Sequence, residues 1–261
     1  MQEQTLERIL RQGLEARGLA PDELTLRRFR IYYENLESFN RVMNLTAITG
    51  EEDAARLHFL DCAALLDAAE PGDASLIDVG TGAGFPGLVL KILRPELKLT
   101  LLDSLDKRLA FLRDTCEKLG FEDVKLVHAR AEEIPEGLRE SFDFASARAV
   151  ARLNVLCELC LPYVKEGGAF LAMKGPDAES EAKEAYVALK TLGGSIGSRT
   201  VIAPSSARSM VTRAQSRPLG SRSGLSSARR RLRPLLISPS SPPSPVSSVQ
   251  ARPAARVSMI F

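Results

Sequence analysis

A glycine-rich loop at residues 76–87, LIDVGTGAGFPG, limits the folds open to this chain more than any other segment. Glycines allow a tight turn and let backbone N–H groups approach a ligand at the start of a helix. Read as GAGFPG, the loop matches the G-x-G-x-x-G fingerprint of dinucleotide-binding proteins. Read as DVGTGAG, it matches the loop of S-adenosylmethionine enzymes. The loop therefore predicts a nucleotide-like cofactor, and the rest of the chain has to choose between the two.

Extended and helical segments alternate from this loop onwards. The expected strands are SLIDVG (75–80), LKLTLLDS (97–104), DVKLVHA (123–129), FDFASARA (142–149) and GGAFLAMKG (167–175). Each strand is followed by a segment with helical character, such as LNVLCELCLPYV. Because parallel strands need crossover helices, the alternation predicts an α/β fold with a doubly wound, mostly parallel sheet covered on both faces. In that fold the ligand lies at the carboxyl ends of the strands.

The N-terminal part of the chain is predicted to be helical. Apolar residues recur at helical spacing in residues 5–18, 24–43 and 51–69. We therefore divide the chain into an N-terminal helical cap (1–70), a cofactor-binding domain (71–194) and a tail (195–261).

The tail has a composition of its own. Its 67 residues include 11 Arg, 17 Ser and 8 Pro with no Lys, Asp or Glu, whereas residues 1–194 carry 24 Lys and Arg against 33 Asp and Glu. A segment with so little periodic apolar pattern cannot offset its chain entropy, so we expect disorder. Two origins stay open: translation of GC-rich codons in a shifted reading frame, or an arm that binds RNA.

Several classes of protein are disfavoured. Nowhere do about 18 apolar residues run together, and the N-terminus lacks the apolar stretch of a signal peptide, so we expect a cytoplasmic protein without a membrane span. The four cysteines, including the C-x-x-C pair Cys157 and Cys160, are expected to be reduced and buried. Since His58 and His128 are the only histidines, a zinc site would lack ligands, and we expect no metal.

Two aspartates bear on the choice of cofactor. Asp78 ends the first strand, two residues before Gly80, where a carboxylate would repel a pyrophosphate but match the ammonium group of a methionine moiety. Alternatively, Asp78 caps amides of the loop. Asp103 ends the second strand, 21 residues after Gly82, where it can accept hydrogen bonds from both ribose hydroxyls of an adenosine ligand or cap the next helix.

The remaining chain favours S-adenosylmethionine. A dehydrogenase would still need a substrate domain with a proton-transfer residue, and here only the helical cap and the tail remain. Methyl transfer needs less, because the sulfonium already activates the methyl group and the protein supplies alignment and a desolvated site.

Seven motifs follow one another along the chain: NLTAI (44–48), HFLD (58–61), IDVGTGAGFPGLVLKI (77–92), LLDSLDKRLAFL (101–112), ARAEE (129–133), SARAVARL (146–153) and AMKG (172–175). Their order and combination are specific, although the glycine loop alone is a weak signal. With these motifs the chain, from about residue 26 to residue 192, resembles the glucose-inhibited division protein B family, bacterial methyltransferases that act on guanine N7 of 16S ribosomal RNA. The resemblance implies a Rossmann-like class I methyltransferase fold, S-adenosyl-L-methionine as cofactor, and a monomer that acts on 16S rRNA or the small ribosomal subunit.

The resemblance also implies site residues. Gly80 and Phe85 would contact the cofactor, Asp103 the ribose, and Ala131 with Glu132 the adenine edge. With the loop residues, the expected cofactor-binding set is Asp78, Gly80, Gly82, Gly84, Phe85, Asp103, Ala131, Glu132 and Arg148. The expected catalytic set, lining the cleft that the guanine enters, is His58, Asp61, Arg130, Arg148 and Lys174. Each has a simpler interpretation: His58 and Asp61 can hydrogen-bond each other along a helix, and Arg130 and Lys174 can be solvated loop charges.

The residues are consistent with an N7 target. Guanine N7 has a free lone pair and no proton to lose, so an in-line displacement needs no general base. The fourth strand ends in SARA, without the Asn-Pro-Pro-aromatic motif of amine methylases or a cysteine to attack a pyrimidine. We expect Arg148 or Lys174 to hold the guanine O6 or a flanking phosphate. Two alternatives stay open: a methyltransferase of this fold for a small molecule or a protein, and a non-catalytic protein that binds RNA through the tail.

The chain departs from the family pattern at about Ser195. The family continues there with two strands in an antiparallel hairpin that is not recognisable here, since RTVIAP and RPLLISP are each stopped by proline. We therefore expect the C-terminal strands to be lost or replaced. If the tail is translated in a shifted reading frame, the fifth strand would form an exposed edge with uncovered apolar surface, which predicts lower stability and aggregation.

Overall fold

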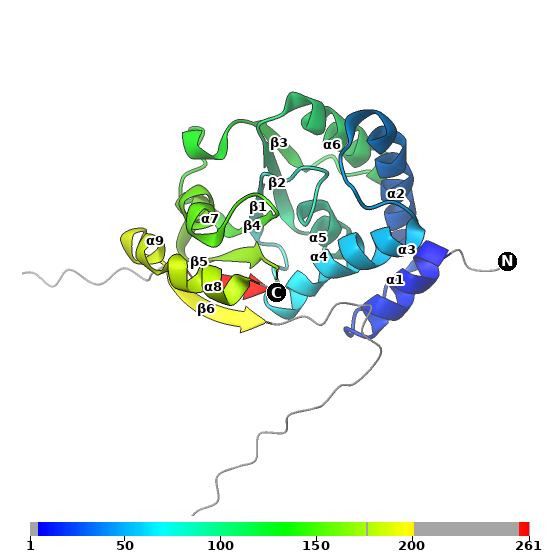
Figure 1. The fold of residues 1–261 in the computed structure, drawn as a ribbon. Helices are drawn as coiled ribbons and strands as arrows, with labels where there is room; N and C mark the ends of the chain where they lie inside the picture. Colours follow the sequence, from blue (N-terminus) through cyan, green and yellow to red (C-terminus); the bar gives the residue numbers. More distant parts are fainter. Residues whose placement is uncertain (1–4, 176, 201–255, 261) are drawn as a thin grey trace, which may run out of the picture. The chain divides into compact units, whose positions relative to one another are not determined.

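A computed structural model describes residues 5–175, 177–200 and 256–260. In these residues a seven-stranded sheet carries helices on both faces (Figure 1). The strand order is β3-β2-β1-β4-β5-β7-β6, and every pairing is parallel. The strands are β1 (Ser75–Val79), β2 (Lys98–Asp103), β3 (Lys125–His128), β4 (Phe142–Arg148), β5 (Val164–Met173), β6 (Ser195–Thr200) and β7 (Arg256–Ile260). The predicted doubly wound parallel sheet is confirmed.

The helices follow the predicted alternation. Before β1 come α1 (Thr5–Glu15), α2 (Glu23–Met43) and a continuous helical run of α3 (Glu51–Asp53), η1 (Ala54–Leu60), α4 (Asp61–Ala63) and η2 (Ala64–Asp67). After β1 come α5 (Gly87–Leu93), α6 (Asp106–Leu119), η3 (Ala131–Glu133), α7 (Leu153–Cys160), η4 (Leu161–Tyr163), α8 (Ala178–Glu184) and α9 (Tyr186–Thr191). The η1 segment is a π-helical turn, a local widening that often occurs at functional sites.

The order of the strands fixes where a ligand can lie. β1 pairs with β2 on one side and with β4 on the other, so Asp78 lies beside Leu101 and Ser146. The direction of winding reverses between β1 and β4, and in open α/β sheets the ligand crevice forms at such a point. The glycine-rich loop leaves β1 at this place.

Two hydrophobic cores cover the two faces of the sheet. Successive strand residues point to opposite faces, so Leu76 belongs to the core shared with α1, α2, α5 and α6, whereas Ile77 and Val79 belong to the core shared with α7, α8 and α9. Burial on both faces explains why the strands read as nearly continuous apolar runs.

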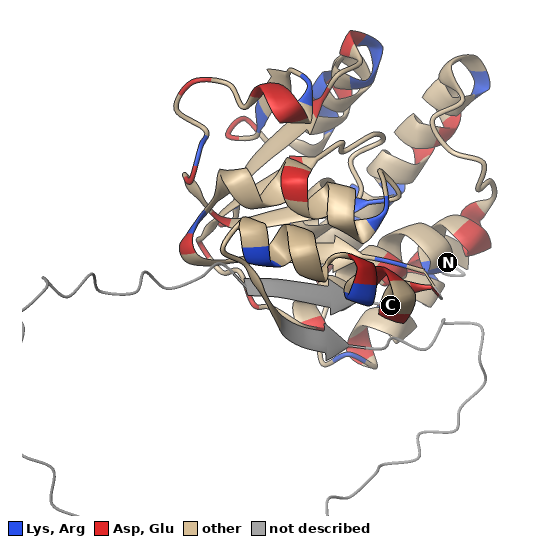
Figure 2. Cartoon of the chain, turned by 60° about the vertical axis from the view of Figure 1, so that its left-hand side comes forward, with Lys and Arg blue, Asp and Glu red and all other residues tan. Residues whose placement is uncertain are grey.

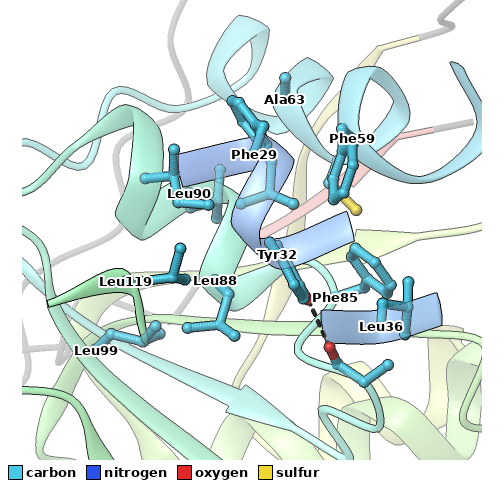
Figure 3. Close-up of a cluster of buried hydrophobic side chains, with 14 of the residues drawn as sticks. Phe29, Tyr32, Leu36, Phe59, Ala63, Phe85, Leu88, Leu90, Leu99 and Leu119 are labelled. Carbon is cyan, nitrogen blue, oxygen red and sulfur yellow. Dashed lines mark hydrogen bonds between the residues drawn. The ribbon is translucent and has the colours of Figure 1, made fainter. Parts of the chain in front are cut away.

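The N-terminal helices pack into the same core as the sheet. Figure 3 shows Phe29 and Tyr32 of α2 next to Phe59 of the π-helical turn and Phe85 of the glycine-rich loop. The ring centroids of Phe29 and Phe59 are 5.0 Å apart, and Tyr32 stacks on Phe85 at 5.3 Å. The predicted helical cap therefore contributes aromatic side chains directly to the loop that follows β1.

Charged residues of both signs are interspersed over the helices (Figure 2). One arginine joins three N-terminal helices: Arg30 of α2 forms two hydrogen bonds with Glu7 of α1, at 2.7 and 2.6 Å, and one with Glu51 of α3 at 2.6 Å. Glu51 also accepts a hydrogen bond from the backbone N–H of Leu6, near the start of α1. Bidentate pairs of this kind fix geometry, so α1 is oriented by charge as well as by its apolar face.

The prediction of an exposed fifth strand was wrong. β7 pairs with β5 from Ala169 to Met173, and β6 pairs with β7, so β5 is an inner strand and the aggregation argument that rested on its exposure does not hold. Both added strands run parallel to β5, in contrast to the antiparallel hairpin of the family pattern. Backbone pairing requires only a few extended residues with free N–H and C=O groups, which a short stretch without proline provides. Residues 201–255, where most of the predicted disordered tail falls, lie outside the described residues.

Candidate active site

A cavity of about 690 Å³ opens at the carboxyl ends of the central strands. Its walls come from the glycine-rich loop, the ends of β2 and β4, the η3 turn and the segment after α2. The predicted site residues that line it are His58, Gly80, Gly82, Phe85, Asp103, Arg130, Ala131, Glu132 and Arg148. Asp61, Asp78, Gly84 and Lys174 are not among the lining residues. Most of the predicted set therefore meets at one place, as the topology requires.

The glycine-rich loop needs its glycines for two reasons. Gly80, Gly82 and Gly84 have φ values of 67°, 61° and 95°, which residues with a side chain adopt only at a cost. A Cβ on Gly80 would lie 2.7 Å from Cγ2 of Val150. A Cβ on Gly84 would lie 2.6 Å from the hydroxyl of Tyr32, so Gly84 serves packing beneath the cavity.

A buried tyrosine holds the middle of this loop. The hydroxyl of Tyr32 donates to the backbone oxygen of Ala83 at 2.5 Å (Figure 3). Tyr32 is fully buried, and burial raises the pKa of its phenol well above the usual value. The hydroxyl therefore stays protonated and remains a donor to the loop.

Asp78 is enclosed beneath the loop. It is fully buried, and its carboxylate accepts hydrogen bonds from the hydroxyl of Thr81 at 2.7 Å, the hydroxyl of Ser146 at 2.8 Å and the backbone N–H of Gly87 at 3.1 Å. Burial raises its pKa, although these hydrogen bonds act in the opposite direction. These contacts correspond to the alternative stated from the sequence, in which Asp78 holds the loop itself, and a contact with a cofactor stays a prediction.

Asp103 lies at the floor of the cavity, at the end of β2. Its carboxylate accepts hydrogen bonds from the backbone N–H groups of Gly82 and Leu105, both at 2.9 Å, and Nη1 of Arg108 lies 3.3 Å away. The side chain is 2% exposed. Asp103 thus ties the glycine-rich loop to the start of α6 and still lines the cavity, so both interpretations stated from the sequence fit its position.

The η3 turn forms another wall. The backbone oxygen of Ala131 accepts a hydrogen bond from the hydroxyl of Tyr163 at 2.8 Å, which anchors the turn to the core of the second face. Glu132 and Arg130 are exposed and pair with each other at 2.6 Å between Oε1 and Nε. The pKa of Glu132 is lowered by a hydrogen bond from its own backbone N–H and by Arg130. Arg130 is therefore a compensated surface charge at the rim.

Arg148 is the central cation of the site. Its guanidinium lies 4.8 Å from the ring centroid of Phe85, and Nη1 donates to the backbone oxygen of Leu57 at 3.2 Å. Nη1 is also 3.5 Å from Oδ2 of Asp61, and Nη2 is 3.0 Å from Nδ1 of His58. His58 and Asp61 each contact Arg148, which differs from the simpler interpretation in which they hydrogen-bond each other.

The contacts of His58 fix its tautomer. Since a guanidinium only donates, Nδ1 of His58 must accept from Arg148, and the proton sits on Nε2. Nε2 then donates to the hydroxyl oxygen of Thr46 at 2.8 Å, which also accepts from the backbone N–H of Ile48 at 3.0 Å. Burial, together with the charge of Arg148, lowers the pKa of His58 to about 3. His58 is therefore a neutral imidazole with both nitrogens engaged.

The segment after α2 is held in the position in which Thr46 contacts His58. Asn44 adopts a left-handed conformation that ends α2, and the side-chain amide of Asn40 forms two hydrogen bonds with the backbone of Thr46, both at 2.9 Å. A chain of hydrogen bonds thus runs from Asn40 through Thr46 and His58 to Arg148. The NLTAI motif (44–48) contains Thr46 and was the signal that could have assigned it to the site, whereas Asn40 lies outside every motif of the sequence.

Lys174 lies behind the cavity wall. Its ammonium donates to the backbone oxygen of Ala151 at 2.8 Å and pairs with Oε2 of Glu181 at 2.7 Å. The two side chains are 9% and 11% exposed. Lys174 is thus a paired internal charge in the structure, which differs from both a solvated loop charge and a group facing the cavity.

The described residues offer little for a metal site or a reactive thiol. Among the residues that the structure describes, no group of three or more His, Cys, Asp or Glu side chains could hold a metal ion. The four cysteines are free and buried, and burial raises the pKa of the Cys62 thiol to about 12. In the same residues, no helix is long and apolar enough to cross a membrane.

Known proteins resemble this chain over most of its length. The family described as rRNA small subunit methyltransferase G (GidB) matches residues 25–204. The ribosomal RNA small subunit methyltransferase G of Alkaliphilus metalliredigens is 47% identical over 191 residues, 72% of this chain and 80% of that protein. The corresponding protein of Bacillus cereus is 48% identical over 188 residues, 70% of this chain and 78% of that protein. A solved S-adenosylmethionine-dependent methyltransferase from Aquifex aeolicus is 20% identical, with a TM-score of 0.42, over 53% of this chain and 81% of its own.

Proposed function

The chain belongs to the rRNA small subunit methyltransferase G family, and from this premise we propose that it transfers a methyl group from S-adenosyl-L-methionine to N7 of a guanine in 16S ribosomal RNA. One observation carries the choice of N7 as the methyl acceptor. Both ring nitrogens of His58, next to Arg148, are engaged in hydrogen bonds, so the site offers no imidazole base. N7 is an acceptor that has no proton to give up.

The cavity fits the cofactor. Its volume of about 690 Å³ lies within the usual range for small-molecule sites. A Cβ on Gly82 would meet no atom closer than 4.0 Å, so the backbone of this residue faces open space that a ligand can approach closely. When bound, the cofactor supplies a methyl group already activated by its sulfonium. We propose that Gly80, Gly82 and Phe85 hold its methionine end.

The adenosine end has its own partners. Asp103 is the carboxylate at the cavity floor, and we propose that it accepts hydrogen bonds from the ribose hydroxyls. Ala131 and Glu132 line the same cavity from the η3 turn and would meet the adenine edge. Asp78 acts beneath the loop, where its three hydrogen bonds keep the loop in shape for the cofactor.

Arg148 is proposed to hold the RNA guanine. A cationic fork suits O6 of guanine or a flanking phosphate, both of which are acceptors. His58, Asp61 and the backbone oxygen of Leu57 accept from the guanidinium and fix its orientation. Arg130, exposed at the rim, would meet the RNA backbone after leaving Glu132. Because N7 loses no proton, alignment of the base with the methyl group is the main task of these residues.

The RNA substrate, the oligomeric state and the cellular compartment belong to the same proposal. An rRNA substrate follows from the family, and we propose that a monomer acts on 16S rRNA or on the small ribosomal subunit in the cytoplasm. Residues 195–261 add 11 arginines to a chain that is otherwise acidic, and polyanion binding through them would be strongly salt-dependent.

The experiment combines the full chain, S-adenosyl-L-methionine and an unmodified 16S rRNA transcript, followed by mass spectrometry of the nucleosides. The expected product is 7-methylguanosine. A matched transcript made with 7-deazaguanosine, in which a carbon replaces N7, should accept no methyl group, because the nucleophilic lone pair is missing.

Other outcomes would overturn the proposal. Methylation of the 7-deaza transcript would show that another atom of the RNA is the acceptor. A methylated protein or small molecule with unmodified RNA would favour another methyltransferase of this fold. RNA binding with a steep salt dependence but no methyl transfer, abolished when the arginines of residues 201–255 are replaced by serine, would favour a non-catalytic RNA-binding protein.

A further inference from the structure

The loop between β4 and α7, residues 149–152, forms the cavity wall next to the glycine-rich loop. Ala149 and Val150 line the cavity, and Val150 is 40% exposed. Val150 also packs over Gly80, where a Cβ would meet it at 2.7 Å. Ala149 has a φ of 56°, in the left-handed region that a residue with a side chain occupies at a cost of about 1–3 kcal/mol. Such a conformation persists only where surrounding contacts enforce it.

One ion pair contacts the C-terminal side of this loop at two points. Lys174, just after β5, donates to the backbone oxygen of Ala151 at 2.8 Å. Oε2 of Glu181, on α8, accepts from the backbone N–H of Leu153 at 2.7 Å and lies 2.7 Å from the Lys174 ammonium. Burial acts to raise the pKa of Glu181, but Lys174 and the Leu153 N–H outweigh it, so the pKa is lowered and the carboxylate stays charged.

The energetics favour a geometric role over a stabilising one. Taking two charges out of water costs about as much as their attraction returns, so an apolar pair of similar volume often serves stability equally well. What an apolar pair cannot supply is a donor for Ala151 and an acceptor for Leu153 at defined positions. Arg152, between them, pairs with Glu184 of α8 at 2.6 Å, which adds a second contact between this region and α8.

We propose that Lys174 and Glu181 are positioning residues that hold the 149–152 loop, so that Val150 forms the apolar wall against which the acceptor guanine packs. This inference rests on the proposed function. Neither charged group touches the RNA: Lys174 does not line the cavity, and its ammonium is engaged by Ala151 and Glu181. The wall matters because in-line transfer requires the base to be aligned with the methyl group, and a shift of about 1 Å can cost on the order of 100-fold in rate.

The test uses two variants of the full chain that keep side-chain volume but remove the donor or the acceptor, Lys174→Met and Glu181→Met, and their double variant. A matched control is the half-buried pair Arg30 and Glu7, which lies between α1 and α2, as Arg30→Met and Glu7→Met. The measurements are kcat and KM for the 16S rRNA transcript, the calorimetric Kd for S-adenosyl-L-methionine, Tm, and the hydrogen-exchange rate of the Leu153 amide.

We expect both variants at the loop to lower kcat by roughly 10- to 100-fold, with the cofactor Kd changed by less than about threefold and with faster exchange at Leu153. The double variant should lose little more than either single variant, because one shared contact is broken. The control variants should lower Tm and leave kcat unchanged. This split between stability and rate separates positioning from a merely structural role.

Two results would overturn the inference. If Glu181→Met keeps kcat while Lys174→Met raises KM for the RNA and weakens its salt dependence, Lys174 contacts the RNA directly. If the Leu153 amide exchanges at the same rate in Glu181→Met and wild type, the pair does not hold the loop. The exchange measurement needs no methyl transfer, so an inactive wild type would count against the proposed function while this test still decides the role of the pair.

Discussion

Nδ1 of His58 accepts a hydrogen bond from Nη2 of Arg148, 3.0 Å away, and both side chains lie against the ring of Phe85. The imidazole stacks on Phe85 with 4.4 Å between the ring centroids. This contact makes the histidine a support for the cation and removes it as a proton acceptor, since its other nitrogen already carries the proton donated to Thr46.

The stability of the fold should depend on pH through His58. Burial and the charge of Arg148 lower its pKa from the ordinary 6.5 to about 3. At a pH between these two values, His58 is protonated in the unfolded state and neutral in the folded state. Between these two values stability should fall as pH falls, by about 1.4 kcal/mol per pH unit, and above pH 6.5 His58 should contribute no pH dependence. Denaturant unfolding at pH 4, 5, 6 and 7 measures this. The same series on His58→Gln should show a shallower slope, and equal slopes would contradict the assignment.

The rate of methyl transfer should not follow a histidine titration. Neither nitrogen of His58 is available, and N7 has no proton to remove, so kcat on the RNA transcript should be nearly constant from pH 6 to pH 8. If a general base with a pKa near 6.5 took part, the rate at pH 6 would be about fourfold lower than the rate at pH 8. Single-turnover rates across this range, at saturating RNA and cofactor, distinguish the two profiles.

Asp103→Asn should weaken cofactor binding. The substitution removes the charge that strengthens hydrogen bonds from ribose hydroxyls, and such charge-assisted bonds contribute about 1.5–3 kcal/mol, so Kd should rise roughly 10- to 100-fold. Calorimetric titration with S-adenosyl-L-methionine measures it. The matched control is Asp106→Asn, an exposed carboxylate three residues away in the first turn of α6, which should leave Kd unchanged. Equal affinities of Asp103→Asn and wild type would remove Asp103 from the ribose site.

Gly80→Ala should weaken cofactor binding in addition to lowering the free energy of unfolding. An alanine there has to adopt a φ of 67° and would also meet Val150 at 2.7 Å. Gly120→Ala provides the control, because Gly120 has a φ of 73° and a Cβ there would meet nothing within 4 Å. Both variants should lose about 1–2 kcal/mol of unfolding free energy from the left-handed backbone. Only Gly80→Ala should also weaken cofactor binding, and an equal Kd in both variants would contradict this account.

Local pattern was sufficient for most of the sheet. The five strands expected from the glycine-rich loop onwards are all present, because apolar runs bounded by turn residues and followed by helical spacing leave little choice of fold. The pattern failed at β5, where the expected exposed edge is paired with β7. Pairing of edge strands depends on backbone groups that every residue carries, so the side chains of residues 195–200 and 256–260 gave no signal for it.

The candidate site, like the sheet, was predictable from the sequence only in part. The fold class, the family and the place of the cofactor loop were predictable from the order of residues, because glycine conformation, strand alternation and motif order are properties of neighbouring residues. Which groups meet became visible in the folded chain: His58 pairs with Arg148 across 90 residues, and Lys174 contacts Glu181 and Ala151 instead of lining the cavity. Hydrogen bonds between side chains depend on distances of about 3 Å and on direction, and those exist only once strands and helices have packed.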